Sequence, residues 1–169
     1  MARAILAMLA CLVGVAAPVA WAAPGRLTDA AARAFVAQQE RAWNRRDLDG
    51  YFAAYTPDAV FVDQTRTPQG AVIRYGDSDL KTAKALSKRA LARTRVAERN
   101  AVDRVTVSAD GASARVQGHK TTRLISAGRE QTLCAQTDQT LVWRGGRVRS
   151  RGQTDTTTRC RDAGRPATR

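Results

Sequence analysis

The sequence is poor in residues on which much enzyme chemistry depends. It has one histidine, three cysteines and three each of Trp, Tyr and Phe among 169 residues. A single histidine excludes a metal site built from several imidazoles. The chain also lacks a G-x-S-x-G element, a glycine-rich phosphate loop and a Cys–His pairing, so a serine hydrolase is not supported. We expect a function that needs neither a metal nor a cofactor.

Lysine is scarce as well, although the chain is strongly basic. There are 28 basic and 15 acidic residues, a net charge of +13, and most of the basic residues are arginines. Either a GC-rich genome or selection for an anionic partner produces such a bias. The charge draws the domain towards lipid headgroups, anionic polymers or nucleic acid at low salt. Because no aromatic stacking residues accompany the arginines, we expect no specific nucleic-acid recognition.

The longest apolar run lies at the N-terminus. Arg3 precedes AILAMLACLVGVAAPVA, and Ala20-Trp21-Ala22 forms a small-x-small cleavage site. The pattern predicts a signal peptide over residues 1–22, cleaved near Ala22/Ala23, and a periplasmic or secreted mature protein without a transmembrane segment. A loose lipoprotein box ending at Cys11 is the alternative.

The rest of the chain has the length of one domain, which we place at 23–160 and follow with a disordered tail over 161–169. Loss of the leader leaves Cys134 and Cys160. In an oxidising compartment two cysteines favour one disulfide, which would close a loop of about 25 residues and contribute about 3 kcal/mol. Two free, partly buried thiols are the alternative.

Apolar periodicity predicts three helices. The first covers about 27–47 with Thr28 or Asp29 as cap, and Asp47 caps a short second helix that Thr56-Pro57-Asp58 ends. The third covers about 78–95 with Ser78 or Asp77 as cap. Its outer side carries a basic stripe, typical of a solvated face: Lys81, Lys84, Lys88, Arg95 and Arg99.

Strand patterns occupy the remainder. AVFVDQT, residues 59–65, predicts a short strand, and RTPQG a loop after it. Four further strands are predicted at about 101–109, 112–126, 130–143 and 147–158, joined by tight turns at Asp110-Gly111, Ala127-Gly128 and Gly145-Gly146. This order predicts an α+β fold, in which a curved antiparallel sheet wraps three N-terminal helices and leaves a cone-shaped cavity.

The segment AWNRRDLDGYFAAYTPDAVFVD resembles the nuclear transport factor two-like superfamily, whose proteins share the pattern N-x-x-D-x-x-x-x-x-x-x-Y/F-x-x-D-A-x-x-x-D. Gly70 and the hairpin TLVWRGGRVRS extend the resemblance over about 27–157. The superfamily includes polyketide-cyclase-like (SnoaL-like) and ketosteroid-isomerase-like proteins. The resemblance implies a cystatin-like roll with a strongly curved mixed or antiparallel sheet and a pocket for a small, partly apolar ligand. It also implies a homodimer through the outer sheet face as one assembly.

The ketosteroid isomerases can be compared position by position. Their catalytic base falls on Asp63 and their oxyanion-hole acid on Asp138, while their oxyanion tyrosine falls on Gln39. In that chemistry the base removes an α-proton and a neutral acid bonds the enolate oxygen. An amide is a poorer acid than a phenol, so Gln39 departs from the pattern; Tyr51 and Tyr55 are candidates to replace it.

Further site candidates follow from the same resemblance. His119 is either an acid–base partner of Asp63, as in dehydratase-like and cyclase-like relatives, or a strand histidine bonded to a neighbour. Trp43, Tyr55 and Phe61 are core aromatics that can also floor the cavity. With Gln39 they form the expected ligand-binding set.

Strand alternation leaves the orientation of the sheet open. Counted from the turns, Asp138 shares a face with polar residues that include Gln117, His119, Gln153 and Asp155, and the other face carries apolar residues such as Val116, Ala135 and Leu141. The polar face either lines a wet pocket or faces outward, and a single bulge would exchange the faces. The same count separates Cys134 from Cys160, so their disulfide requires a bulge or a loosened terminus.

Two functions remain. The first is an exported ligand-binding domain that works as a cofactor-free isomerase, dehydratase or cyclase, with Asp63 as base and Asp138, His119 or Gln39 as partners. The second is a non-catalytic binding or structural module that engages an anionic envelope partner through its arginines. A buried Asp63 in a deep pocket favours the first, and a pocket filled by Trp43 and Tyr55 favours the second.

Overall fold

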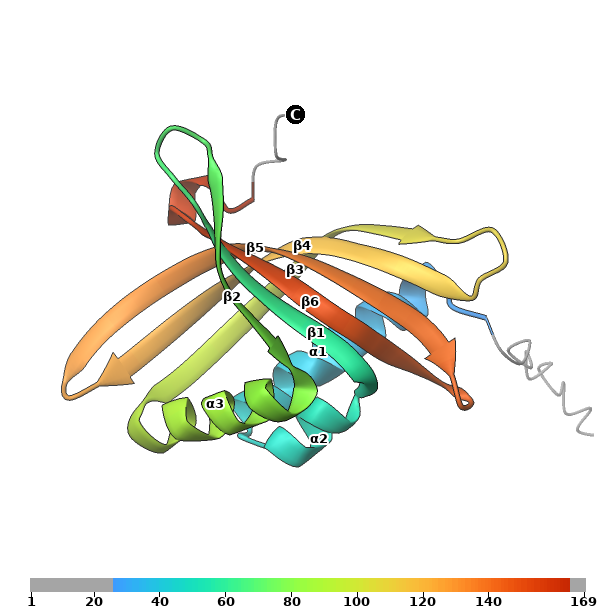
Figure 1. The fold of residues 1–169 in the computed structure, drawn as a ribbon, viewed down its shortest axis with the longest axis horizontal. Helices are drawn as coiled ribbons and strands as arrows, with labels where there is room; N and C mark the ends of the chain where they lie inside the picture. The colour runs from blue at the N-terminus through green and yellow to red at the C-terminus, as the bar shows by residue number, and fades with distance from the viewer. Residues whose placement is uncertain (1–25, 165–169) are drawn as a thin grey trace, which may run out of the picture.

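Three helices lie on one side of a six-stranded mixed sheet (Figure 1). The computed structural model describes residues 26–164, so the expected signal peptide and residues 165–169 lie outside the described residues. The helices are α1 (Asp29–Asn44), α2 (Leu48–Ala53), α3 (Leu80–Arg93) and the short 3-10 helix η1 (Cys160–Asp162). The strands are β1 (Tyr55–Arg66), β2 (Val72–Asp79), β3 (Arg95–Val107), β4 (Ser113–Ser126), β5 (Arg129–Arg144) and β6 (Arg147–Thr158). The expected α+β class is confirmed.

The strand order is β2-β1-β6-β5-β4-β3, with β2 and β3 at the two edges. Strands β1 and β6 are parallel, and every other neighbouring pair is antiparallel. The predicted meander of four strands is therefore β3 to β6. Its two-residue hairpin turns use the positive φ angles that such turns require, at Ala127, Gly128, Gly145 and Gly146.

Side-chain caps set the helix starts. Thr28 accepts a hydrogen bond from the backbone of Ala31, and Asp47 accepts one from Gly50, as predicted. The predicted cap of the third helix is wrong. Asp79 caps α3, because β2 holds Asp77 and Ser78 in extended conformation.

Two strand predictions also need correction. Strand β2 was not predicted, because its sequence VIRYGDSD has no alternation of apolar and polar residues and most of its residues are exposed. Strand β3 begins at Arg95, well before the predicted Ala101. Arg95 and Arg99 therefore belong to a strand and not to the basic stripe of α3.

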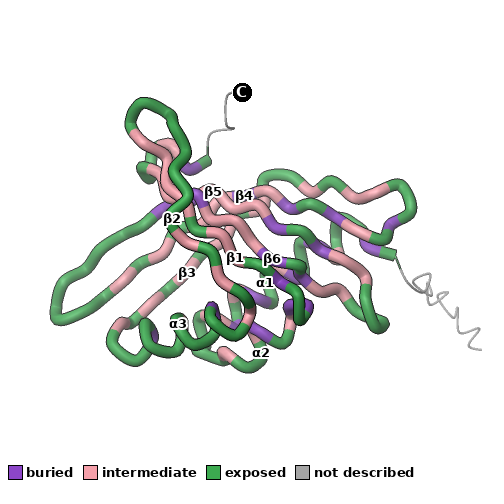
Figure 2. The backbone as a smooth tube through the Cα atoms, in the orientation of Figure 1, coloured by how far each residue is buried: buried purple, intermediate pink, exposed green. Residues whose placement is uncertain are grey.

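The helices cover the apolar face of the sheet. Buried Leu27, Ala32 and Phe35 pack against Ala114, Val116 and Leu141 of the sheet. A second cluster joins α2, β1 and α3 through Phe52, Tyr55, Ala59 and Ala83. Buried residues gather where the helices meet the sheet, while the hairpin ends are exposed (Figure 2). The face that carries Asp138 consequently points away from the helices.

A bulge at Gly152 changes which residues of β6 face the helices. Leu141 pairs with Ser150, but Gln139 pairs with Gln153, so the register shifts between them. Gly152 has φ +137°, and a Cβ there would lie 1.9 Å from the carbonyl oxygen of Val60. Only glycine fits this position.

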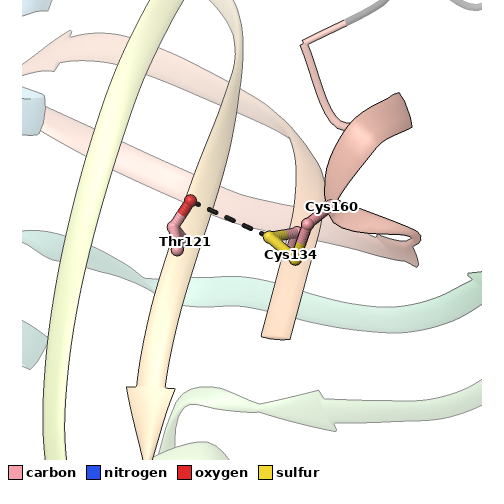
Figure 3. The surroundings of a disulfide bond; sticks show 3 residues. All are labelled: Thr121, Cys134 and Cys160. Carbon is pink, nitrogen blue, oxygen red and sulfur yellow. Dashed lines mark hydrogen bonds between the residues drawn. A yellow bond between two sulfur atoms is a disulfide. The ribbon is translucent and has the colours of Figure 1, made fainter. Parts of the chain in front are cut away.

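The sequence analysis placed Gln153 and Asp155 on the face of Asp138, and this is wrong. Asp155 pairs with Thr137 and therefore faces the helices, while Asp138 pairs with Thr154 on the outer face. The same bulge brings Cys160 to the face of Cys134. The expected disulfide is present, with the two Cα atoms 4.9 Å apart, and it joins η1 to β5 (Figure 3).

Candidate functional site

Helix α1 carries two side-chain N–H donors without partners, the amide of Gln39 and the indole of Trp43. Gln39 is only 6% exposed; its Oε1 accepts a hydrogen bond from Nε2 of Gln139 at 2.9 Å. Neither Nε2 of Gln39 nor Nε1 of Trp43, one turn later, has a partner among the described residues. A buried donor without a partner costs about 1–3 kcal/mol. An oxygen atom of a bound molecule would remove this cost.

A hollow lies between α1 and the strands, beside Gln39. Its cavity volume is about 20 Å³, roughly the room that one water molecule needs. Its lining is largely polar: Gln39, Tyr51, Glu98, Asn100, Gln139 and Gln153.

A half-buried ion cluster lies on the same face of the sheet. Nζ of Lys120 is 2.5 Å from Asp155 and 3.8 Å from Glu98, and the three side chains are 18%, 22% and 11% exposed. Burial alone would lower the pKa of Lys120, but the charges of Asp155 and Glu98 outweigh burial and raise the pKa above its ordinary value. Lys120 therefore keeps its positive charge at neutral pH.

Two tyrosines adjoin this cluster. Oη of Tyr55 donates a hydrogen bond to Oη of Tyr51 at 3.0 Å. Burial, and then the charge of Glu98, raise the pKa of Tyr51; burial, and then Tyr51, raise the pKa of Tyr55. Both phenols stay protonated. Tyr51 lines the hollow and can donate its own proton to a bound oxygen.

Asp63 lies beside Asp155 on the parallel strands β1 and β6. Since paired residues point to the same face, both carboxylates face the helices. Asp63 is exposed and lies outside the lining of the hollow, so the buried base in a deep pocket that would favour an enzyme is not what the structure shows. Partial burial, and then the negative charge of Asp155, raise the pKa of Asp63, while Lys120 opposes this. Strand β1 continues to Arg66, so Asp63 stands at a bulge within the strand and not at its end.

The structure brings together Asp63, Gln39, Trp43, Tyr55 and Phe61 on the helix side of the sheet. The ring centroids of Tyr55 and Phe61 are 4.7 Å apart, and those of Trp43 and Tyr51 are 5.0 Å apart. The rings of Trp43, Tyr51, Tyr55 and Phe61 thus form one chain of aromatic contacts.

The structure does not bring Asp138 or His119 to this group. Asp138 is on the outer face, where Nε of Arg115 lies 2.9 Å from both of its carboxylate oxygens. His119 follows the inward Gly118, and its Nδ1 is 3.0 Å from Asp103. Both side chains are thus held in pairs on the opposite side of the sheet.

No protein-family model matches the sequence, and no curated protein matches it, but solved structures do. The ketosteroid isomerase-like protein from Erwinia carotovora atroseptica has a TM-score of 0.61 at 15% identity, over 77% of this chain and 95% of its own. The β subunit of benzoate 1,2-dioxygenase from Burkholderia mallei has a TM-score of 0.62 at 16% identity, over 78% and 91%. An NTF-2 like protein from Shewanella oneidensis has a TM-score of 0.56 at 15% identity, over 75% and 97%.

The chain has the nuclear transport factor two-like fold. At these identities the likeness concerns the fold, and this fold carries several functions. The expected fold resemblance is confirmed; the site has to be judged from its own residues.

Within this nuclear transport factor two-like fold, sequence reasoning missed Lys120, Glu98 and Asp155 as site residues. Lys120 lies in the middle of a strand, and nearby strands carry the inward carboxylates of Glu98 and Asp155. Such a pattern would have indicated an ion cluster. The signal was hidden because the face of Asp155 depends on the bulge at Gly152.

The residues of the site do not form a metal centre. Among residues 26–164 no three His, Cys, Asp or Glu side chains gather as metal ligands would. In the same range there is no helix long and apolar enough to cross a membrane.

Proposed function

We propose that the helix-facing side of the sheet binds a small, partly apolar carbonyl compound and that Asp63 exchanges a proton with it. The reaction would be that of a cofactor-free isomerase, dehydratase or cyclase. The position of Asp63 beside Asp155 carries this proposal, because partial burial, and then the negative charge of Asp155, raise the pKa of Asp63 above that of a free carboxylate. A base is most effective when its pKa lies near the working pH.

The neighbouring groups have separate roles in this proposal. Lys120 binds Asp155 directly, which leaves Asp63 as the carboxylate free to take up and release a proton. The unpartnered Nε2 of Gln39 and the phenol of Tyr51 would donate hydrogen bonds to the carbonyl oxygen. Since Asp63 lies outside the hollow, the ligand would extend from the hollow past the Lys120–Asp155 pair.

Export of the protein is also a proposal. The disulfide between Cys134 and Cys160 is consistent with an oxidising compartment. Export is tested by determining the N-terminal residue of the protein recovered from the periplasm or medium of the native bacterium. An N-terminus at Ala23 supports cleavage after residue 22. An N-terminus at Cys11 supports the lipoprotein alternative.

The activity is tested by exchange of α-protons for solvent deuterium in a panel of cyclic ketones and β-diketones, followed by NMR. We expect Asp63→Asn to slow exchange by roughly 10²–10⁴-fold, the usual contribution of a general base. Asp138→Asn is the matched control on the outer face and should leave the rate unchanged. Equal losses in both variants, or no exchange by the unsubstituted protein, would reject Asp63 as the base.

Ligand binding is tested separately by thermal shift and by equilibrium titration with the same panel. We expect Gln39→Leu to weaken binding of ketones but not of the matching hydrocarbons, since only the ketones use the amide. Binding that is identical in both proteins would exclude Gln39 from the site.

A further inference from the structure

The two edges of the sheet, β2 and β3, differ in how their backbone is bonded (Figure 1). On β3, side chains of α1 form hydrogen bonds with the backbone of Glu98, Asn100 and Val102. On β2, the backbone of residues 72–78 has no hydrogen-bond partner outside β1 among residues 26–164. An unpaired edge of this kind can accept a further strand.

The β2 edge also exposes apolar side chains. Seven large apolar residues are exposed in the described part of the chain, and three of them lie on β2: Val72, Ile73 and Tyr75, at 46%, 52% and 64%. Protected edges often carry proline or lysine, and β2 has neither. Exposed apolar side chains that gather in one place mark an interaction surface.

A bulge arranges the charges of β2. Tyr75 is an extra residue in this strand, since its neighbours Arg74 and Gly76 pair with consecutive residues of β1. In a regular strand, residues three apart would point to opposite faces. The bulge instead places Arg74 and Asp77 on one face, where their side chains are 2.7 Å apart and both are exposed.

This arrangement is self-complementary. A two-fold axis at the bulge would bring two copies of β2 side by side in antiparallel register, with Arg74 of each copy opposite Asp77 of the other. Opposite charges that face each other across a strand pair are favourable. Ile73 and Ser78 would meet in the same register. They also share a face, because their partners in β1 are four residues apart.

We propose that two copies of the chain pair through their β2 edges and continue the sheet across a two-fold axis. Each β2 then gives the other the backbone hydrogen bonds that it lacks, and the exposed rings of Tyr75 lie beside the axis. The charges favour a second copy over an unrelated strand, because Arg74 and Asp77 complement each other in this register. The proposal does not rest on the proton transfer proposed for Asp63.

The test is sedimentation equilibrium of the chain from Ala23, which contains every described residue, over a series of concentrations. R74D would place two carboxylates opposite each other across the axis, and D77R would place two guanidinium groups there. In a mixture of these two variants the charges at both contacts are complementary again. R89D, at an exposed arginine of α3, makes the same change of charge as R74D and is the control. Circular dichroism melts confirm that all variants fold.

We expect a monomer–dimer equilibrium for the unsubstituted protein and for R89D. Each of R74D and D77R alone should lower the association constant by roughly 10-fold or more, and their mixture should recover it as a heterodimer. A monomer at every concentration would overturn the proposal. So would a dimer that neither variant weakens, since it would use another surface such as the outer sheet face. Weakening in both variants without recovery in the mixture would reject this register as well.

Discussion

The side chain of Asn44 forms hydrogen bonds with both the N–H and the carbonyl of Glu98 in the edge strand β3. Nδ2 of Asn44 donates to the Glu98 carbonyl at 2.8 Å, and Oδ1 accepts from the Glu98 N–H at 2.8 Å. Helix α1 does the same further along β3, where Glu40 accepts from the backbone of Asn100 and Arg33 donates to that of Val102. The edge strand is thereby protected from pairing with another chain.

Asn44→Ala should lower the free energy of unfolding by about 1–2 kcal/mol, because two hydrogen bonds are lost at a partly exposed position. It should also increase aggregation at high concentration, since the β3 edge becomes free to pair. Urea unfolding and light scattering measure the two effects. Arg41→Ala, an exposed change on the same helix, is the control and should be neutral within about 0.5 kcal/mol. A neutral Asn44→Ala would contradict this role.

Gly152→Ala should destabilise the protein by more than about 2 kcal/mol, because its Cβ would strike the backbone of Val60 and its φ is unfavourable for alanine. The control is Gly70→Ala, which also has a positive φ but open space around it, and should cost about 1 kcal/mol. Chemical denaturation measures both. Equal losses of stability in the two variants would show that the close approach of β1 to β6 does not contribute to the cost of Gly152→Ala.

Lys120→Met should lower the free energy of unfolding by about 3–5 kcal/mol at neutral pH, because Asp155 and Glu98 would be left buried without a cation. Lys88→Met, at an exposed position of α3, should have an effect within about 0.5 kcal/mol. A loss of stability in Lys120→Met no larger than that in Lys88→Met would contradict the role of Lys120 as the cation of this cluster.

The raised pKa of Asp63 predicts a pH dependence with a definite sign. The folded state binds this proton more tightly than the unfolded chain, so stability falls as the pH rises from about 4, the unfolded value, through the raised folded value. Asp63→Asn removes this penalty. We expect the variant to be more stable than the unsubstituted protein at pH 7 and to lose that advantage at pH 3. An advantage that does not change with pH would contradict the raised pKa.

Local signals in the sequence determined much of the fold. The caps Thr28 and Asp47, the apolar periodicity of α1 and the three tight turns of the meander act over a few residues, so each could be identified without knowledge of the rest. Tyr55 was likewise expected in the core, and it is buried there.

Only the tertiary structure decided which carboxylates face the helices. Strand β2 exists because β1 offers it a partner, although its own sequence shows no strand pattern. The bulge at Gly152 arises from the close approach of β1 to β6, and it turns Asp155 inward while Asp138 stays outward. Side chains alternate with period two, so one extra residue reverses every position after it. That shift depends on contacts between strands far apart in the sequence, which a local pattern does not record.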